Sequence, residues 1–469
     1  MKLRFITALV GFTVLSGCAT APVSLPAKMT APDSWRTPPA KLTPESASPE
    51  WWKPLADAEL ERLIELALVE NADIRIASAR IQQARALTAG AIAEQRPNLA
   101  SGAEVRRERV PAARFTDTDG VAARIPPHRR NQFSTQIVEA TYEIDPLGRL
   151  ALAARASEAE LFATEAEHRA VGLWVAHEVV VAYAETRLAE VLLPQANREF
   201  ELATELLAAE RRKREAGLSP LATVRAAEDQ LADVHEKLAN LERGRSLGRA
   251  RLALALGKAP TELVWSPIGD YFASFPNTGV IDADLPAAVL DRRPDIDAAW
   301  HRVVASTTEA ERARLEKYPK LTLTGSAGFL SETLRRWLTG DALAWVIGAT
   351  LQGPLLDGGR VKARTDAASA IATQRQMEYR KVVLQALNEV EVALTEAAHA
   401  QERWRIAESS VRRRGADTTA ASDRLRQGAG DRLALLRAEL AVIEAHRAAT
   451  TRRHDLVLAW ASLQKMLGR

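Results

Sequence analysis

The sequence contains two copies of one pattern, and this duplication constrains the fold more than any other feature. Three pairs of glycines are each 211 residues apart: Gly148 and Gly359, Gly217 and Gly428, and Gly257 and Gly468. One offset kept by three landmarks across about 110 residues marks an internal repeat. We therefore predict a first repeat at 51–257, a connecting segment at 258–284 and a second repeat at 285–469.

The offset changes nearer the N-terminus. Asp73 and Asp295 are 222 residues apart, and so are Pro97 and Pro319. Since 222 exceeds 211 by 11, the segment between Pro97 and Gly148 is 11 residues longer than its counterpart in the second repeat. The two copies therefore differ in their strand region.

Each repeat is predicted to contain a helix, a pair of strands and two long helices. The strand pairs show the alternation of apolar and small polar residues that is typical of strands. The predicted ranges are 58–96 and 285–318 for the first helices, about 99–145 and 321–355 for the strand pairs, about 150–215 and 218–257 for the long helices of the first repeat, and about 361–427 and 430–467 for those of the second. A helix of more than 60 residues is ~100 Å long, far beyond the globular average.

The strands have one apolar and one polar face. The apolar face carries Val138, Ala140, Tyr142 and Ile144 in the first repeat, and Leu343, Trp345, Ile347, Ala349 and Leu351 in the second. The opposite face of the first repeat carries Thr135, Glu139, Thr141 and Glu143. This alternation is typical of a membrane barrel, but barrels need about eight strands or more, and an open edge in lipid leaves backbone groups unpaired. We therefore expect several chains to assemble.

The long helices carry a heptad spacing that predicts coiled-coil packing. In the returning helix of the first repeat, apolar residues alternate steps of three and four: Val224, Ala227, Leu231, Val234, Leu238 and Leu241. Pro194 interrupts the preceding helix, where the second repeat has Arg405. Because proline removes a helical hydrogen bond, we expect a kink or break in the first repeat only.

The N-terminus predicts export. Residues 1–17 have a basic start and a short apolar run, as a signal peptide does, and Cys18 is the only cysteine. The pattern resembles a bacterial lipobox, which implies a covalent lipid on Cys18, and Ala19 favours the outer membrane. Residues 18–50 are then a lipid anchor and an extended tether. The alternative is a signal peptide with an incidental cysteine.

No motif indicates catalysis, a metal site or nucleic-acid binding. The net charge is only +3, and the eight histidines form no ligand pattern. The glycine-rich Asp357-Gly358-Gly359-Arg360 lacks the lysine and hydroxyl residue of a phosphate loop. We predict no enzyme activity, no catalytic residues, no metal and no nucleic-acid partner, and no cofactor apart from the lipid on Cys18.

Several segments together resemble the TolC-type outer-membrane efflux proteins, in particular the lipoprotein branch that serves resistance-nodulation-division pumps. The resemblance covers almost the whole mature chain and depends on the order and spacing of the segments. They are Trp51-Trp52, Asn71-Ala72-Asp73-Ile74, Tyr142 to Arg149, Leu290 to Ile296, Tyr318-Pro319-Lys320-Leu321, Leu356 to Arg360, Asn388-Glu389-Val390 and Leu467-Gly468.

The resemblance implies a mainly α fold with a small membrane β part. Strand pairs of a homotrimer form a twelve-stranded β-barrel, continued by a long α-helical barrel. A periplasmic adaptor (membrane fusion) protein, an inner-membrane pump of the resistance-nodulation-division type and outer-membrane lipid are the implied partners. The implied function is passive conduction of small molecules, such as drugs and toxic compounds, to the exterior.

The resemblance also implies sites at the helix turns. Adaptor contacts fall on Gly217, Leu218, Ser219, Gly428 and Ala429, and a gate falls on Leu433 and Arg437. The family pattern has an aspartate where this chain has Arg437. Either Arg437 pairs with Glu439 or Asp431, or the gate has different electrostatics, since three arginines would reverse the charge preference. We favour the pairing, because three unpaired arginines in a narrow ring would repel one another.

Three alternatives remain at this point. The chain could be a duct for type I protein secretion, a structural coiled-coil lipoprotein or a lipid-anchored periplasmic enzyme. The amphipathic strands disfavour the spacer, and the lack of a catalytic constellation disfavours the enzyme.

Overall fold

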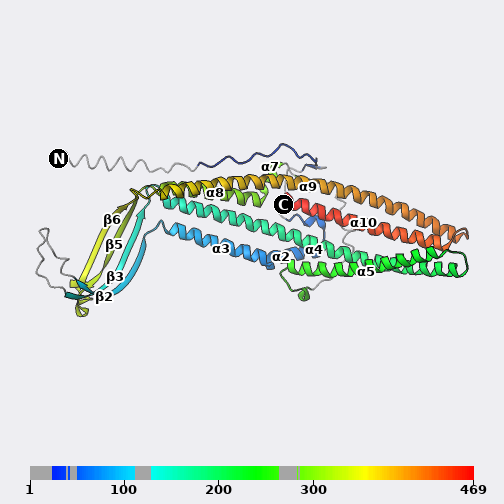
Figure 1. Cartoon of the computed structure of the whole chain (residues 1–469), viewed down its shortest axis with the longest axis horizontal. Coiled ribbons are helices and arrows are strands. Elements are labelled where there is room, and N and C mark those ends of the chain that lie inside the picture. Colours follow the sequence, from blue (N-terminus) through cyan, green and yellow to red (C-terminus); the bar gives the residue numbers. More distant parts are fainter. Residues whose placement is uncertain (1–23, 39–40, 43–49, 111–127, 264–281, 284–285) are drawn as a thin grey trace. The chain divides into compact units, whose positions relative to one another are not determined.

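The computed structural model describes residues 24–38, 41–42, 50–110, 128–263, 282–283 and 286–469 (Figure 1). Its contacts divide the chain into two compact units. The strand unit contains Gln82–Phe162 and His301–Met377, together with the residues up to Ala27. The helix unit contains Lys28–Ile81, Ala163–Trp300 and Glu378–Arg469.

The long helices of the two repeats have matching bounds. The first repeat has α3 (Ala72–Ala93), α4 (Arg149–Glu215) and α5 (Leu221–Ala255), and the second has α8 (Pro294–Leu315), α9 (Arg360–Arg426) and α10 (Arg432–Met466). The offsets between equivalent bounds are the 222 and 211 residues read from the sequence. The glycines that end α4 and α9, Gly217 and Gly428, have φ of 75° and 71°. This left-handed conformation favours glycine, which explains why glycines mark the repeat.

Each helix predicted before the strands is in fact two helices. In the first repeat, α2 (Ala58–Glu70) ends at Asn71, and in the second, α7 (Pro286–Arg292) ends at Arg293. Asn71 Oδ1 accepts a hydrogen bond from the backbone N–H of Asp73 and so caps α3. In the second repeat Pro294 starts α8, because proline fits the first turn of a helix but not its interior.

The two break residues hold equivalent places. Asn71 Nδ2 donates to the carbonyl of Ala255 at 2.8 Å, in the last turn of α5. Arg293 Nη1 donates to the carbonyl of Met466 at 3.1 Å, in the last turn of α10. Each repeat therefore ties the start of its α3-type helix to the end of its returning helix, with a different side chain.

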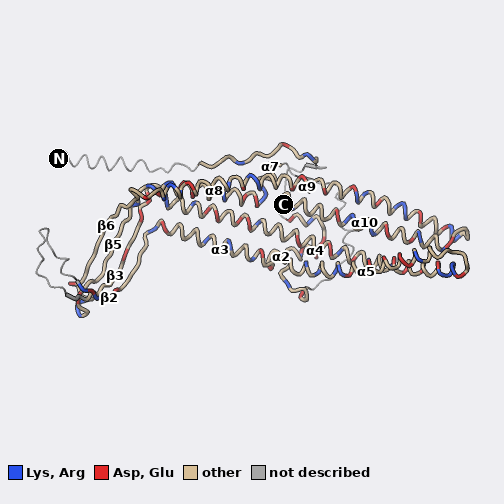
Figure 2. Tube along the Cα trace, viewed as in Figure 1, with Lys and Arg blue, Asp and Glu red and all other residues tan. Residues whose placement is uncertain are grey.

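The strand unit holds a four-stranded antiparallel sheet in the order β2-β3-β5-β6. Its strands are β2 (Asn98–Val110), β3 (His128–Ile144), β5 (Lys320–Ser331) and β6 (Leu343–Gln352). The register places the predicted apolar residues of β3 and β6 on one face with Leu321, Leu323 and Phe329 of β5. Figure 2 shows few charged residues between the ends of these strands. A short parallel pair, β1 (Lys41–Leu42) with β4 (Asp282–Ala283), completes the described strands.

One predicted strand position is wrong. Thr135 pairs with Phe329, whereas Val138 pairs with Ala327, because β3 is irregular between Gln136 and Val138. The extra residue reverses the alternation, so Thr135 lies on the apolar face and not with Glu139.

Of the kink or break predicted at Pro194, the break is wrong, because α4 continues through this residue. Pro194 is exposed, while the neighbouring Leu192, Leu193 and Ala196 are buried. Packing on the buried side therefore holds the helix despite the missing hydrogen bond.

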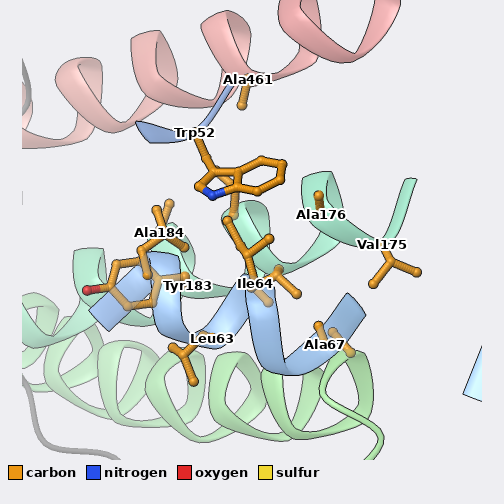
Figure 3. Close-up of a cluster of buried hydrophobic side chains, with 14 of the residues drawn as sticks. Trp52, Leu63, Ile64, Ala67, Val175, Ala176, Tyr183, Ala184 and Ala461 are labelled. Carbon is orange, nitrogen blue, oxygen red and sulfur yellow. The ribbon is translucent and has the colours of Figure 1, made fainter. Parts of the chain in front are cut away.

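The main core of the helix unit surrounds α2 (Figure 3). Leu63, Ile64 and Ala67 of α2 pack against Tyr183 and neighbouring residues of α4. The burial of a leucine or isoleucine side chain of this kind contributes about 1.5–3 kcal/mol. The Tyr183 hydroxyl donates to Asp57 at 2.5 Å, and Asp57 caps α2. The core thus fixes the position of α2 on α4.

Part of the predicted tether packs on a helix. Residues 24–38 contain no helix or strand, yet the Trp35 side chain is buried beside Val390 and Leu394 of α9. The backbone N–H groups of Arg36 and Thr37 donate to the carboxylate of Glu391. The segment is therefore extended and fastened to α9 near its middle.

The remaining observations concern the N-terminus, membrane-spanning helices and metal sites. The signal peptide 1–17 and Cys18 lie outside the described residues. Within the described ranges, no helix has an apolar stretch long enough to cross a membrane. In the same ranges, no group of three His, Cys, Asp or Glu side chains is placed to hold a metal ion.

Candidate functional site: the two hairpin turns

The turns from α4 to α5 and from α9 to α10 share one backbone design. In the first, the N–H of Leu218 donates to the carbonyl of Lys213 at 2.8 Å, and that of Gly217 to Arg214 at 2.9 Å. In the second, the N–H of Ala429 donates to the carbonyl of Arg424 at 2.9 Å, with a matching bond from Gly428. This pair of hydrogen bonds around a glycine in the left-handed conformation is the Schellman motif.

Four of the five predicted adaptor contacts lie on the surface of these turns. Gly217, Leu218, Gly428 and Ala429 are exposed, and Leu218 has 76% of its surface open. Ser219 is buried, and its hydroxyl donates to Glu210 Oε2 at 2.9 Å. The exposed pairs could receive a partner, whereas the Ser219 hydroxyl already has one within the chain.

Glu210 is the central residue of this network. Its side chain is only 4% exposed, although it is a carboxylate on the packed side of α4. Besides the bond from Ser219, Glu210 Oε1 accepts one from Arg437 Nη2 of α10 at 2.6 Å. Because a buried carboxylate is costly without partners, these two donors offset the burial of Glu210.

The expected partners of Arg437 were therefore wrong. Arg437 pairs with Glu210, 227 residues earlier, and in the described part of the chain it forms no ion pair with Asp431 or Glu439. Asp431 instead pairs with Lys213 at 3.0 Å and caps α10 through the N–H of Leu433. The bond from Lys213, and then that from Leu433, lower the pKa of Asp431.

A third ion pair joins the same two helices. Arg432 of α10 contacts both carboxylate oxygens of Glu205 of α4, at 2.8 and 3.0 Å. This pair and Lys213–Asp431 are about half exposed, so each is worth roughly 0–1 kcal/mol. The Glu210–Arg437 pair matters more because its carboxylate is buried.

The two predicted gate residues have different surroundings in the single chain. Leu433 is buried in a cluster with Leu202, Leu206, Leu436 and Leu440. Arg437, one helical turn later, is 60% exposed. Leu433 thus packs α10 onto α4, and Arg437 adds a charged contact at the edge of the same interface.

Sequence reasoning missed Glu210, although a signal was present. Leu202, Ala203, Leu206 and Leu207 precede it and are all buried. Steps of three and four from these residues place Glu210 on the same buried face. A carboxylate at such a position predicts a cationic or hydroxyl partner, but not which one.

The described architecture agrees with a known family. A family model described as outer membrane efflux protein matches residues 63–258 and 285–469. This chain belongs to the outer membrane efflux protein family. The two matched ranges correspond closely to the two repeats, and the family places the chain in the outer membrane.

Individual relatives of this efflux protein cover nearly its whole length. It is 27% identical to the pyoverdine export outer membrane protein OpmQ of Pseudomonas aeruginosa, over 100% of this chain and 97% of the relative. It is 26% identical to the toluene efflux pump outer membrane protein TtgF of Pseudomonas putida, over 89% of this chain and 85% of the relative.

Solved channels have the same fold as this efflux protein. The outer-membrane channel OprN superimposes with a TM-score of 0.83 at 26% identity, covering 96% of this chain and 99% of that one. VceC of Vibrio cholerae gives 0.75 at 23% identity, covering 90% and 98%. The TolC-like fold and the family predicted from the sequence are thereby confirmed.

Proposed function

We propose that this efflux protein is one subunit of a homotrimeric, passive duct for small molecules across the outer membrane. The observation that carries the proposal is the four-stranded sheet, with one apolar face and with β2 and β6 at its edges. In lipid, each unpaired backbone group of an edge strand costs several kcal/mol. Edges of neighbouring copies must therefore pair, and three copies would give a twelve-stranded barrel.

The helices supply the second part of the duct. Both α4 and α9 have 67 residues, which corresponds to about 100 Å of helix. Such a length suits a conduit that continues from the outer membrane into the periplasm. A periplasmic adaptor would contact the exposed Gly217 and Gly428 turns, and an inner-membrane pump of the resistance-nodulation-division type would supply the energy.

The relatives' names support small organic cargo. Pyoverdine export and toluene efflux are named for two of them. The duct itself would be largely unselective, with cargo chosen by the pump.

Planar-bilayer recording of the purified full-length protein tests this function, with its mass in detergent as a second measurement. We expect stable pores and a mass of three chains. A folded protein that never conducts, or that conducts as a single chain, would overturn the proposal.

The gate proposal concerns Arg437. Its bond to Glu210 neutralises part of its charge and holds α10 against α4, which supports a duct that is closed at these turns in its resting state. We expect Arg437→Ala to raise the open probability and shift ion preference towards cations. Unchanged conductance and ion preference would remove Arg437 from the gate.

The lipid anchor is a separate proposal. We expect intact-mass analysis of the membrane-extracted protein to show cleavage before Cys18 and added acyl mass. Cys18→Ser should lose that mass while leaving pore formation in bilayers intact. A wild-type mass without acyl chains would contradict the anchor.

A further inference from the structure

A cavity of about 390 Å³ lies at the junction of sheet and helix in the second repeat, within the strand unit. Arg314 lines it from the last turn of α8 and Lys317 from the turn after that helix, while Leu355 and Asp357 line it from the loop after β6. Lys362 and Asp366 complete it from the first turns of α9. We call these six residues the junction pocket.

The charges of the junction pocket favour an anion. Asp357 is occupied, because its carboxylate accepts bonds from the N–H groups of Gly359 at 2.9 Å and Val361 at 2.7 Å. Asp366 pairs with Lys362 at 2.8 Å, and the three cations that line the pocket outnumber its two carboxylates by one. Arg314 pairs outside the pocket, with Glu311. Lys317 lies over the Tyr318 ring, 4.9 Å from its centroid, and forms no ion pair among the described residues.

An apolar surface adjoins these cations. Leu355 and Leu356 are fully exposed and follow β6 after Gly353 and Pro354. Leu351, Ile347 and Trp345 of β6 are exposed on the face that the proposed function places against acyl chains. From strand to helix, the order is therefore acyl-facing residues, two free leucines and then cations.

The first repeat is not built this way. Its equivalent loop has one partly exposed leucine, Leu147, and Glu143 pairs with Arg149 at 2.7 Å. In the second repeat Pro354 stands six residues before Arg360, as Glu143 stands before Arg149, so the carboxylate is missing. The cationic, leucine-flanked junction is specific to the second repeat.

We propose that the junction pocket binds the phosphate of an anionic phospholipid in the inner leaflet of the outer membrane. A phospholipid has the matching order of acyl chain, glycerol and phosphate, and basic residues beside an apolar membrane surface attract anionic headgroups. The proposal rests on the proposed function, since that function places the sheet in the membrane.

The test is add-back of phosphatidylglycerol to delipidated full-length protein, followed by native mass spectrometry. The variant Arg314→Gln/Lys317→Gln/Lys362→Gln should lower the bound fraction at limiting lipid about tenfold, since several charges act together. The matched control Arg380→Gln/Lys381→Gln/Arg403→Gln removes three exposed cations of α9 outside the pocket and should bind as wild type. Equal binding by both triple variants would overturn the proposal.

A second arm separates lipid from free phosphate. Leu355→Ser/Leu356→Ser should weaken phosphatidylglycerol binding severalfold while keeping the cations. If inorganic phosphate displaces the lipid at equal concentration, or if the leucine variant binds the lipid fully, the lipid proposal fails. Bilayer conductance is recorded for every sample. If the pocket variant forms pores and binds the lipid as wild type does, only the junction-pocket proposal is rejected. If the wild-type protein forms no pores, the proposed function is rejected.

Discussion

The two repeats have the same backbone and different side-chain contacts. Their long helices start and end at equivalent positions, and both turns use the same glycine motif. Yet the counterparts of Ser219 and Glu210, 211 residues later, are Gly430 and Ala421. The counterpart of Arg437, 211 residues earlier, is Ala226. Backbone geometry has been kept in both copies, whereas the polar contacts have become complementary between copies. The two turns therefore have similar backbones, but the charged partner of Glu210 in the first repeat comes from the second repeat.

The largest expected effect concerns the glycines that end the returning helices. A Cβ at Gly257 would lie 2.6 Å from the backbone oxygen of Glu70, and one at Gly468 would lie 3.1 Å from Cγ and 3.2 Å from Cα of Arg293, which is a looser contact. Both positions also have positive φ. We expect Gly257→Ala to lower the free energy of unfolding by about 3 kcal/mol and Gly468→Ala by about 1 kcal/mol. Thermal unfolding in detergent measures both, and equal losses would contradict the asymmetry.

The break residues come next. Asn71 is buried and both caps α3 and bonds to Ala255, so Asn71→Ala should cost about 2 kcal/mol. Arg293→Ala should cost less, about 1 kcal/mol, because its carboxylate partners Asp295 and Glu389 are about 40% exposed. Asn71→Asp keeps the cap acceptor and should recover part of the loss. A larger loss at Arg293 would reverse this ranking.

The charged link between turns gives a smaller effect on stability and a distinct one on conductance. Glu210→Gln removes the charge that holds Arg437 and should cost about 1–2 kcal/mol. The matched variant Glu205→Gln affects a half-exposed pair and should cost about 0.5 kcal/mol or less. In bilayers, only Glu210→Gln should raise the open probability, and a double variant with Arg437→Ala should add little. Fully additive effects would show that the two residues act separately.

The effect that is smallest at neutral pH is a difference in pH dependence. Burial, and then the charge of Lys465, lower the pKa of His177 from 6.5 to about 4. The unfolded chain therefore binds more protons between pH 6.5 and 4, so stability is full above this window and falls as pH decreases through it. The second repeat has Asn388 at the equivalent position.

His177→Asn thus copies the second repeat into the first. We expect it to reduce the stability lost between pH 7.5 and pH 5 by about 2 kcal/mol. His454, whose pKa is also lowered by burial, should keep the rest of the dependence in place, although Asp455 and Glu185 oppose that shift. Chemical unfolding at the two pH values measures the change. An unaltered pH dependence would show that His177 titrates normally.

The parts of the fold that sequence could predict are those set by local backbone rules. Glycine is favoured where φ is positive, so the ends of α4 and α9 could be read at Gly217 and Gly428. The breaks at Asn71 and Arg293 were missed because helical periodicity continues on both sides of them. The position of Thr135 was missed because one extra residue in β3, between Gln136 and Val138, reverses the faces of the residues that precede it.

The polar contacts of the site depend on distant residues. Arg437 has acidic residues nearby in sequence, yet its partner lies on another helix and in the other repeat. Local spacing cannot rank such partners, since distance in the sequence says nothing about which helices pack. Pro194 shows the opposite case, where packing overrides a strong local signal.

Because residues 35–37 are bound to α9, only the part of the tether before Trp35 can bridge the distance between this helix and the membrane. Trp35 lies 17 positions after Cys18, and 17 residue steps span at most roughly 60 Å when fully extended. Glu391 lies 31 residues along α9 from its start at Arg360, about 47 Å of helix rise. With Cys18 acylated as proposed, the fully extended tether is only about 13 Å longer than the distance along α9 that it must cover. Deleting more than about four residues between Cys18 and Trp35 would then pull either the lipid from its leaflet or Trp35 from its pocket.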